Sequence, residues 1–270
     1  MSSASGAERV NVRVLSQMKQ HGDKISMLAT YDYYTARTLD RCGVDLLLVG
    51  DTVGMAFGGQ DTTLSVLLDH MVYHAEIVAR AAERAMVIGD MPFLTYQVNP
   101  DQAVENAGRL MQKSKVHAVK LEGGRAMVPV VKRILQAGIP VMGHLGLTPQ
   151  SVHRFGGFRV QGKDQESAAR LRDAAQALQE VGCFALVLEA IPHDLATEIS
   201  QSLAIPTIGI GAGPGCDGQV LVAPDMLGIT GFKARYLRRY ANVATIIGDA
   251  ARQFVQDVKS GSFPNESESY

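Results

Sequence analysis

The stretch Ala118-Val-Lys-Leu-Glu-Gly-Gly124 places two charged side chains inside an apolar run of strand length that two glycines end. Because alternate residues of a strand point to the same side, Lys120 and Glu122 face one side together, and the apolar residues beside them face the other. In a sheet covered on both faces, a buried lysine and glutamate are costly unless they meet partners, a metal ion or a substrate. The stretch therefore predicts a strand with a functional face.

Apolar segments of similar length recur along the chain as continuous runs of Val, Ile, Leu and Met, a pattern typical of parallel strands buried on both faces. Helical patterns lie between them, and Gly43, Gly138 and Gly182 are placed to end helices shortly before the next strand. The predicted strands are Ile25 to Tyr31, Leu46 to Gly50, Met86 to Asp90, Ala118 to Leu121, Pro140 to Gly143, Ala185 to Leu188, Ile205 to Gly209 and, more weakly, Val220 to Ala223.

This alternation predicts an α/β fold, a (β/α)8 TIM barrel that forms a single domain over residues 1–270, close to the usual ~250 residues of such barrels. An open, doubly wound parallel sheet is the alternative. A short helix at Val12 to Gln20 precedes the barrel, and a helix at Ala241 to Lys259 follows it. The terminal segments 1–10 and 261–270 are polar and expected to be loose.

The composition of the chain limits the kinds of binding partner that we expect. The net charge of -1 and the pI near 6.7 give no electrostatic reason to expect nucleic acid or an anionic membrane. The N-terminus has no signal-peptide core, and no apolar run approaches 18 residues. Three cysteines without CxxC spacing indicate neither a disulfide framework nor a zinc site, so a reducing cytoplasm fits best. We expect small-molecule partners and further copies of this chain.

Six ionisable side chains fall on or just after predicted strands, where barrel active sites lie. Each has a structural explanation by itself: an aspartate can cap a helix, a lysine and a glutamate can pair, and a histidine can be hydrogen-bonded in a core. Their coincidence favours a shared function, because independent structural uses would scatter them over both ends of the strands. The six are Asp51, Asp90, Lys120, Glu122, His144 and Glu189.

Three of these groups, Asp51, Asp90 and Glu122, are hard oxygen donors from neighbouring strands with no soft donor among them. Oxygen-only ligation suits Mg²⁺, which keeps positions open for water or substrate oxygens. A 2-oxo acid chelated through its keto and carboxylate oxygens would let the ion act as a Lewis acid on developing enolate charge. The set predicts an open-sided magnesium site.

The other three groups suit the substrate. Lys120 and His144 are placed to hold its carboxylate or enolate oxygen, and Glu189 is the candidate base for the proton on the carbon next to the ketone. Two long glycine-containing connections, Thr52 to Thr63 and Leu145 to Asp164, are expected to be binding loops or lids at the same rim.

The stretch Gly209-Ile-Gly-Ala-Gly213 follows the seventh predicted strand. Its backbone amides could cradle an anion or let a flat ligand approach closely. It is not a dinucleotide-binding fingerprint, since Gly213-Pro214 would not continue into a helix.

An ordered set of motifs resembles the ketopantoate hydroxymethyltransferase family over roughly residues 25–232. No single motif is decisive, but the set in this order is specific. The motifs are Thr30-Tyr31-Asp32-Tyr33, Leu48-Val49-Gly50-Asp51 with Gly54-Met55, Asp90-Met91-Pro92-Phe93, Lys120-Leu121-Glu122-Gly123-Gly124, Gly143-His144-Leu145-Gly146-Leu147-Thr148-Pro149-Gln150, Leu188-Glu189, and Gly209 to Gly213 followed by Asp217-Gly218-Gln219.

The resemblance implies a (β/α)8 barrel that transfers a hydroxymethyl group from 5,10-methylenetetrahydrofolate to 2-oxoisovalerate (3-methyl-2-oxobutanoate) through a Mg²⁺-chelated enolate. The product, ketopantoate, leads to pantothenate and coenzyme A. It also implies a homo-oligomer, commonly a decamer.

By position, the resemblance places the family's metal-binding carboxylates on Asp51, Asp90 and Glu122, its substrate-holding lysine and histidine on Lys120 and His144, and its base on Glu189. Asp51 and Asp90 also fall at its substrate site.

The chain departs from the family pattern at three places. Thr52, expected at the substrate, stands where the family usually has serine, and its added methyl group would crowd the substrate. Lys163-Asp164 replaces the more usual Gly-Arg, and the tail after Phe263 lacks the histidine that the family often carries. None of these changes touches the six ionisable groups.

Two rival functions share these features. One is a metal-dependent carbon–carbon lyase of the isocitrate lyase and phosphoenolpyruvate mutase type. Lyases of this type that use a catalytic cysteine carry it mid-chain, whereas residues 122–182 contain no cysteine here. The other is a non-catalytic barrel that binds a 2-oxo acid, against which stands the cost of burying six polar groups without use.

Overall fold

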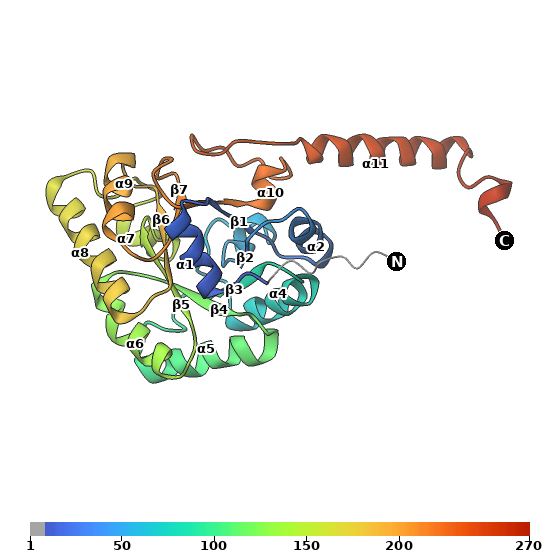
Figure 1. Cartoon of the computed structure of the whole chain (residues 1–270). Coiled ribbons are helices and arrows are strands. Elements are labelled where there is room, and N and C mark those ends of the chain that lie inside the picture. Colours follow the sequence, from blue (N-terminus) through green and yellow to red (C-terminus); the bar gives the residue numbers. More distant parts are fainter. Residues whose placement is uncertain (1–8) are drawn as a thin grey trace. The chain divides into compact units, whose positions relative to one another are not determined.

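The computed structural model describes residues 9–270, and within them eight parallel strands close into a barrel in which β8 pairs with β1. This confirms the predicted (β/α)8 barrel and excludes the open sheet. Figure 1 shows the strands enclosed by the helices that connect them. The strands are β1 Ile25–Ala29, β2 Leu46–Val49, β3 Met86–Asp90, β4 Ala118–Glu122, β5 Val141–Gly146, β6 Ala185–Glu189, β7 Thr207–Ile210 and β8 Gly218–Val222.

The helices begin and end at the expected signals. Asn99 caps α5 by accepting a hydrogen bond from the backbone of Gln102, with proline in the first turn, and Gly182 ends α8 at a φ of 112° that favours glycine. The helices are α1 Val12–His21, α2 Tyr33–Arg41, α3 Val53–Ala56, α4 Leu68–Ala81, α5 Pro100–Ser114, α6 Val128–Gln136, α7 Val152–Phe155, α8 Gln165–Val181, α9 His193–Ser202, α10 Ala223–Met226 and α11 Val243–Ser260, with 3₁₀ turns η1 Arg125–Met127, η2 Pro149–Ser151 and η3 Glu266–Glu268.

Seven of the eight strands differ from the predicted boundaries, most by one or two residues at an end, and β5 and β8 show the differences that matter most for the site and for barrel closure. The fifth strand was expected to end at Gly143, but β5 continues to Gly146, so His144 lies within the strand. The eighth was expected to begin at Val220, but β8 begins at Gly218, which pairs with Ile25 of β1. In both cases pairing with neighbouring strands extends the element into residues of low apolar content.

The chain divides into two compact units, Met1–Val222 and Ala223–Tyr270. The first contains the whole barrel. In the second, α11 has no buried residue. The expectation of one domain over residues 1–270 stays a prediction. Residues 1–8 of the expected loose N-terminus lie outside the described residues, whereas Val10 is buried and its backbone donates a hydrogen bond to Arg84 O (2.9 Å).

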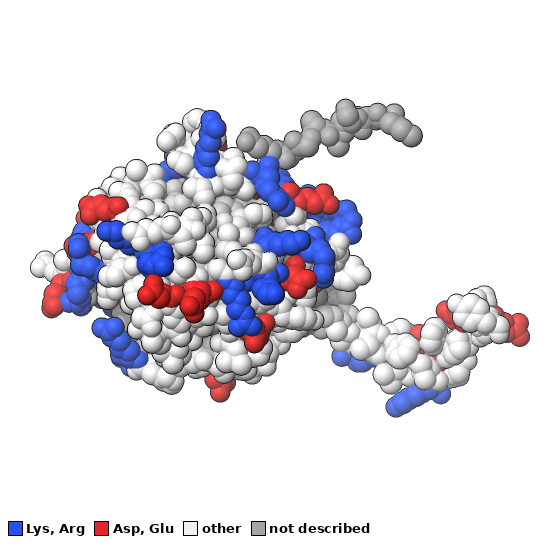
Figure 2. Space-filling model, turned by 90° about the horizontal axis from the view of Figure 1, so that it is seen from below, with Lys and Arg blue, Asp and Glu red and all other residues white. Residues whose placement is uncertain are grey.

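The surface carries both signs of charge. On the face that Figure 2 presents, Lys and Arg side chains lie interspersed with Asp and Glu. Within residues 9–270, no helix is both long and apolar enough to cross a membrane.

Candidate active site

The strand register brings the six predicted groups to the carboxyl ends of the strands. Asp90 lies beside Lys120, and Glu122 lies beside His144. The same rim of the barrel carries Glu189 at the end of β6 and Asp51 directly after β2. All six line one cavity, whose lining residues are Ala29, Leu48, Asp51, Thr52, Asp90, Lys120, Glu122, His144, Pro149, Val187, Glu189, Ile210, Val220 and Val222.

The cavity has two chemically different walls. The polar groups come mainly from β3, β4, β5 and the end of β6, whereas aliphatic side chains of β1, β2, β6, β7 and β8 form the other wall. A ligand with a charged end and a branched apolar end therefore matches the cavity better than a uniformly polar one.

Lys120 is buried, and its Nζ lies 2.7 Å from Asp90 Oδ1. Burial lowers the pKa of Lys120, but the charges of Asp90, Glu122 and Asp51 outweigh this and raise it above its usual value. Lys120 is therefore a fixed positive charge at neutral pH.

His144 lies between two glutamates: Nε2 is 3.2 Å from Glu189 Oε2, and Nδ1 is 3.6 Å from Glu122 Oε1. Burial and Lys120, whose Nζ is 3.3 Å from Nδ1, lower the pKa of His144. The contacts with the two glutamates outweigh them and raise the pKa of His144 to about 9. His144 is therefore protonated at neutral pH and can orient Glu189.

Asp51 and Asp90 carry more negative charge into the interior than their surroundings compensate. Burial, followed by the charges of Asp90 and Glu122, raises the pKa of Asp51 well above its usual value. Burial also raises the pKa of Asp90, although Lys120 opposes the shift. A further cation would stabilise both carboxylates in their charged forms.

The donor set fits Mg²⁺. Asp51, Asp90 and Glu122 supply only carboxylate oxygens, and burial, together with the charges of neighbouring carboxylates, raises the pKa of Asp51 and Asp90. In the arrangement described for residues 9–270, no three Asp, Glu, His or Cys side chains are yet grouped as metal ligands. The carboxylates instead contact Lys120 and Gln150.

Sequence reasoning missed two buried residues that touch this set. The side chain of Gln150 donates to Asp51 Oδ2 (2.9 Å), and its backbone N donates to Glu122 Oε2 (3.0 Å). The hydroxyl of Tyr96 donates to Gln150 Oε1 (2.7 Å). Gln150 ends one of the quoted motifs, but nothing in the sequence distinguishes a buried glutamine from a polar turn residue.

Thr52 also lines the cavity, and its Oγ1 lies 2.7 Å from the hydroxyl of Tyr31. The hydroxyl group that the resemblance expects at this position is therefore present and is held by a second side chain. Tyr31 is buried; it belongs to one of the quoted motifs, but no role was predicted for it.

The glycines after β7 have a packing explanation. A Cβ atom on Gly213 would lie 2.4 Å from His193 Cβ, and one on Gly215 would lie 2.0 Å from Thr197 Oγ1. Close approach of this loop to α9 therefore accounts for Gly213 and Gly215 without a ligand. The two long connections are partly helical, since one contains α3 and the other contains η2 and α7.

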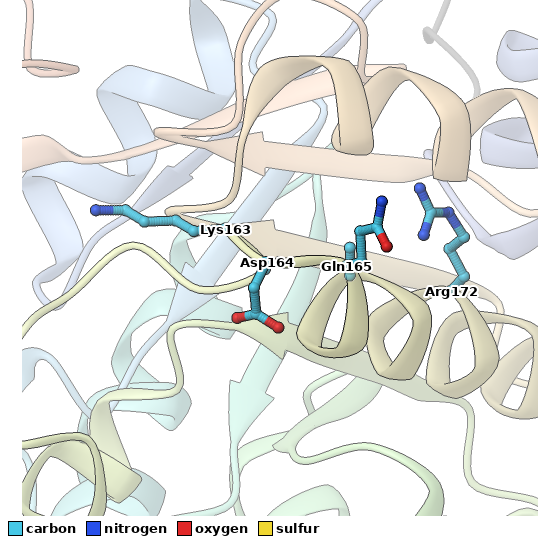
Figure 3. Close-up of a pocket in the computed structure, with 6 residues that line it drawn as sticks. Lys163, Asp164, Gln165 and Arg172 are labelled. Atoms are coloured by element: carbon cyan, nitrogen blue, oxygen red, sulfur yellow. The ribbon is translucent and has the colours of Figure 1, made fainter.

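A wider hollow lies where the loop after α7 enters α8, lined by Lys163, Asp164, Gln165 and Arg172 among others. Figure 3 shows that these side chains do not converge. Asp164 accepts a hydrogen bond from Ser167 N (2.8 Å) as the cap of α8, and Arg172 pairs with Glu198 (2.6 Å). Their charges serve helix capping and surface pairing, so the rim cavity remains the candidate site.

Low-identity structures share the barrel. Phosphonopyruvate hydrolase, solved in complex with oxalate and Mg²⁺, is 13% identical with a TM-score of 0.60, covering 95% of this chain and 92% of its own. A 2,3-dimethylmalate lyase, described as a member of the PEP mutase/isocitrate lyase superfamily, is 17% identical with a TM-score of 0.58, covering 96% and 91%. These likenesses support the fold.

Sequence relatives are much closer. A protein named 3-methyl-2-oxobutanoate hydroxymethyltransferase from Prosthecochloris aestuarii is 53% identical over 266 residues, covering 97% of this chain and 96% of the relative. One of the same name from Syntrophus aciditrophicus is 49% identical over 271 residues and covers both chains completely. The family model described as ketopantoate hydroxymethyltransferase matches residues 9–266. The resemblance inferred from the motifs is thus confirmed, and the chain belongs to the ketopantoate hydroxymethyltransferase family.

Proposed function

We propose that this chain transfers a hydroxymethyl group from 5,10-methylenetetrahydrofolate to 2-oxoisovalerate and forms ketopantoate. The observation that carries the proposal is the convergence of Asp51, Asp90, Lys120, Glu122, His144 and Glu189 on one cavity in a member of this family. The aliphatic wall of the cavity suits the isopropyl group of the acid, and the charged wall suits its keto and carboxylate oxygens.

Asp51, Asp90 and Glu122 would hold Mg²⁺. When bound, the ion supplies a Lewis acid for the negative charge that develops on the keto oxygen. The raised pKa values of Asp51 and Asp90 support this assignment, because burial disfavours their charged forms and a bound cation would offset this. The Mg²⁺ of phosphonopyruvate hydrolase, which has the same fold, is consistent with it.

Glu189 would remove the proton from C3 of the acid, since it lies at the cavity and keeps partial access to solvent, with 14% of its side chain exposed. Protonated His144 would orient Glu189 through the 3.2 Å contact. Lys120 would hold negative charge on the substrate. C3 then bonds to the one-carbon unit of the folate as the two carbon–nitrogen bonds that hold this unit break, and water supplies the hydroxyl oxygen. The protons from C3 and from water go to the two nitrogens of the tetrahydrofolate that leaves.

We further propose a homo-oligomer, a decamer as in the family pattern, in the cytoplasm. The helix α11 supports assembly, because a helix without a buried residue carries Ile246, Ile247, Phe254, Val255 and Val258 at exposed positions. Three cysteines without a disulfide suit a reducing compartment. Sedimentation equilibrium tests the assembly, and a monomer at micromolar concentration would contradict it.

Ketopantoate formation is the direct test of the activity. Purified protein with Mg²⁺, 2-oxoisovalerate and 5,10-methylenetetrahydrofolate should form ketopantoate, which mass spectrometry detects. A lyase would instead cleave a 2-hydroxy acid such as 2,3-dimethylmalate, and a binding protein would do neither. All three cysteines lie within the described residues and none lines the cavity, which argues against cysteine-dependent cleavage.

A further inference from the structure

We propose that Gln150 is a positioning residue that presets Asp51 and Glu122 for the divalent ion, an inference that rests on the metal site proposed above. Gln150 lies in η2, in the long connection after β5, and is 7% exposed. It joins a carboxylate that follows β2 to one at the end of β4, two strands that are not neighbours in the barrel.

The side-chain amide of Gln150 has only one orientation that satisfies its surroundings. Its Nε2 faces two acceptors, Asp51 Oδ2 at 2.9 Å and the carbonyl of Met91 at 3.0 Å. Its Oε1 faces two donors, the hydroxyl of Tyr96 at 2.7 Å and the side-chain amide of Gln97 at 2.9 Å. Turning the amide over would set an oxygen against two oxygens, so the network fixes the donor toward Asp51.

Tyr96 completes the hydrogen-bond network on the Oε1 side of Gln150. Its side chain is fully buried, and its hydroxyl lies 3.2 Å from the carbonyl and 3.1 Å from the backbone N of Glu122. Gln150 and Tyr96 therefore both tie to the end of β4, so displacing either would disturb the position of the Glu122 carboxylate.

The hydrogen bonds of Gln150 leave the second oxygen of each carboxylate available to a metal ion. Gln150 holds one oxygen of each carboxylate, Oδ2 of Asp51 and Oε2 of Glu122. Within residues 9–270, no hydrogen bond engages Asp51 Oδ1, and Glu122 Oε1 has only the 3.6 Å contact to His144. A neutral amide fixes the carboxylates without neutralising them, whereas a lysine in its place would compete with the cation and a glutamate would repel both neighbours.

Replacing the amide by an apolar chain of similar size, Gln150→Met, tests the proposal. We expect the Kd for Mn²⁺, measured by electron paramagnetic resonance on the folded protein, to rise about 10–100-fold, the usual cost of losing a residue that orients metal ligands. The control is Gln179→Met, which removes a glutamine whose Oε1 accepts hydrogen bonds from Ala204 N and Ile205 N. It should lower the melting temperature without changing the Kd.

Tyr96→Phe removes the hydroxyl group that donates to Gln150 Oε1. It tests the positioning role if Gln150→Met does not fold. It should raise the Kd for Mn²⁺ about 3–10-fold, since the Nε2 contact to Asp51 survives. An unchanged Kd in folded Gln150→Met, or in Tyr96→Phe where the first variant does not fold, overturns the positioning role while leaving the metal site intact. Wild-type protein that binds no Mn²⁺ overturns the metal site itself.

Discussion

Two lysine–aspartate pairs lie at opposite ends of the barrel strands, each with a separation of 2.7 Å. Lys120 and Asp90 meet at the carboxyl ends, where the cavity opens. Lys19 of α1 and Asp217 meet at the amino ends, directly before β8. Both pairs are largely shielded from solvent, yet they differ in the number of carboxylates that surround the lysine.

At the amino ends the charges balance. Asp217 Oδ2 accepts hydrogen bonds from Thr207 N (2.8 Å) and Thr207 Oγ1 (3.0 Å) as well as from Lys19, whose Nζ also donates to Ser200 O (2.9 Å). One carboxylate there has one lysine and local donors. This arrangement connects α1 to β7 and β8 and contributes to stability, and it does not require a bound ligand.

At the carboxyl ends the charges do not balance. Lys120 lies among the carboxylates of Asp51, Asp90 and Glu122, and the pKa values of both aspartates are raised because burial and mutual repulsion exceed what one lysine offsets. The two pairs have equal distances, and the surplus negative charge around one of them supports the proposed site at the carboxyl ends.

The largest expected effect is a difference in kcat/KM between variants of Asp90 and Asp217. Asp90→Asn should lower kcat/KM by on the order of 10⁴-fold, because a lost metal ligand removes several kcal/mol of charge stabilisation. Asp217→Asn should lower the melting temperature and leave kcat/KM per folded molecule within about twofold, since it lies at the amino ends. Steady-state ketopantoate formation and thermal unfolding of both variants measure this. Equal losses of kcat/KM in the two variants would contradict the proposed difference between the two ends of the barrel.

Glu189→Gln should lower turnover by about 10²–10⁴-fold, the range for losing a general base. With wild-type protein and Mg²⁺, the C3 proton of 2-oxoisovalerate should exchange with D₂O without folate, as followed by NMR. The variant should lose this exchange while binding Mn²⁺ normally, since Glu189 is no ligand in this account. Undiminished exchange in the variant would rule out Glu189 as the base.

The two lysines should differ in stability. Without divalent ions, Lys120→Met should lower the free energy of unfolding by about 3–5 kcal/mol, because it leaves buried carboxylates without their cation. Lys19→Met should cost only about 1–2 kcal/mol, since Thr207 continues to donate to Asp217. Urea unfolding in EDTA measures both, and a larger loss for Lys19→Met would contradict the charge argument.

The smallest expected effect is a pH dependence of the metal-free protein. The pKa of His144 is raised from 6.5 to about 9 in the folded state, so its contribution to stability is full below pH 6.5 and is lost as the pH rises through 9. The raised pKa of Asp51 acts in the same direction, its contribution being full only below about pH 4.

Unfolding in EDTA should therefore show stability falling between pH 6.5 and 9. His144→Gln should flatten this window, and Mg²⁺ should reduce the slope because it favours charged carboxylates. Wild-type stability that rises across the window would contradict the assignment.

The barrel and the convergence of the six ionisable groups on one rim could be predicted because apolar runs and charged strand ends are local signals. The end of β5 could not, since Gly143-His-Leu-Gly146 has little strand propensity and is held by pairing with β6, where Gly146 lies beside Glu189. The start of β8 at Gly218 likewise depends on pairing with β1. Such contacts join residues distant in sequence.

The residues that support the site could not be predicted either, because they too act through contacts between positions distant in sequence. Gln150 contacts Asp51 across 99 positions of sequence, and Tyr96 reaches Glu122 across 26. A sequence indicates which side chains can do chemistry, but only the folded arrangement identifies the neutral residues that hold them. A direct pair of Lys120 with Glu122 was the structural alternative for these two groups, but Lys120 pairs with Asp90.

The central claim is that the surplus carboxylates at the carboxyl ends bind one divalent ion, and anomalous scattering from a Mn²⁺-soaked crystal tests it most directly. We expect a peak within coordination distance of carboxylate oxygens of Asp51, Asp90 and Glu122, and none at Asp217. A peak remote from all three carboxylates, or full turnover in protein stripped of divalent ions, would contradict it.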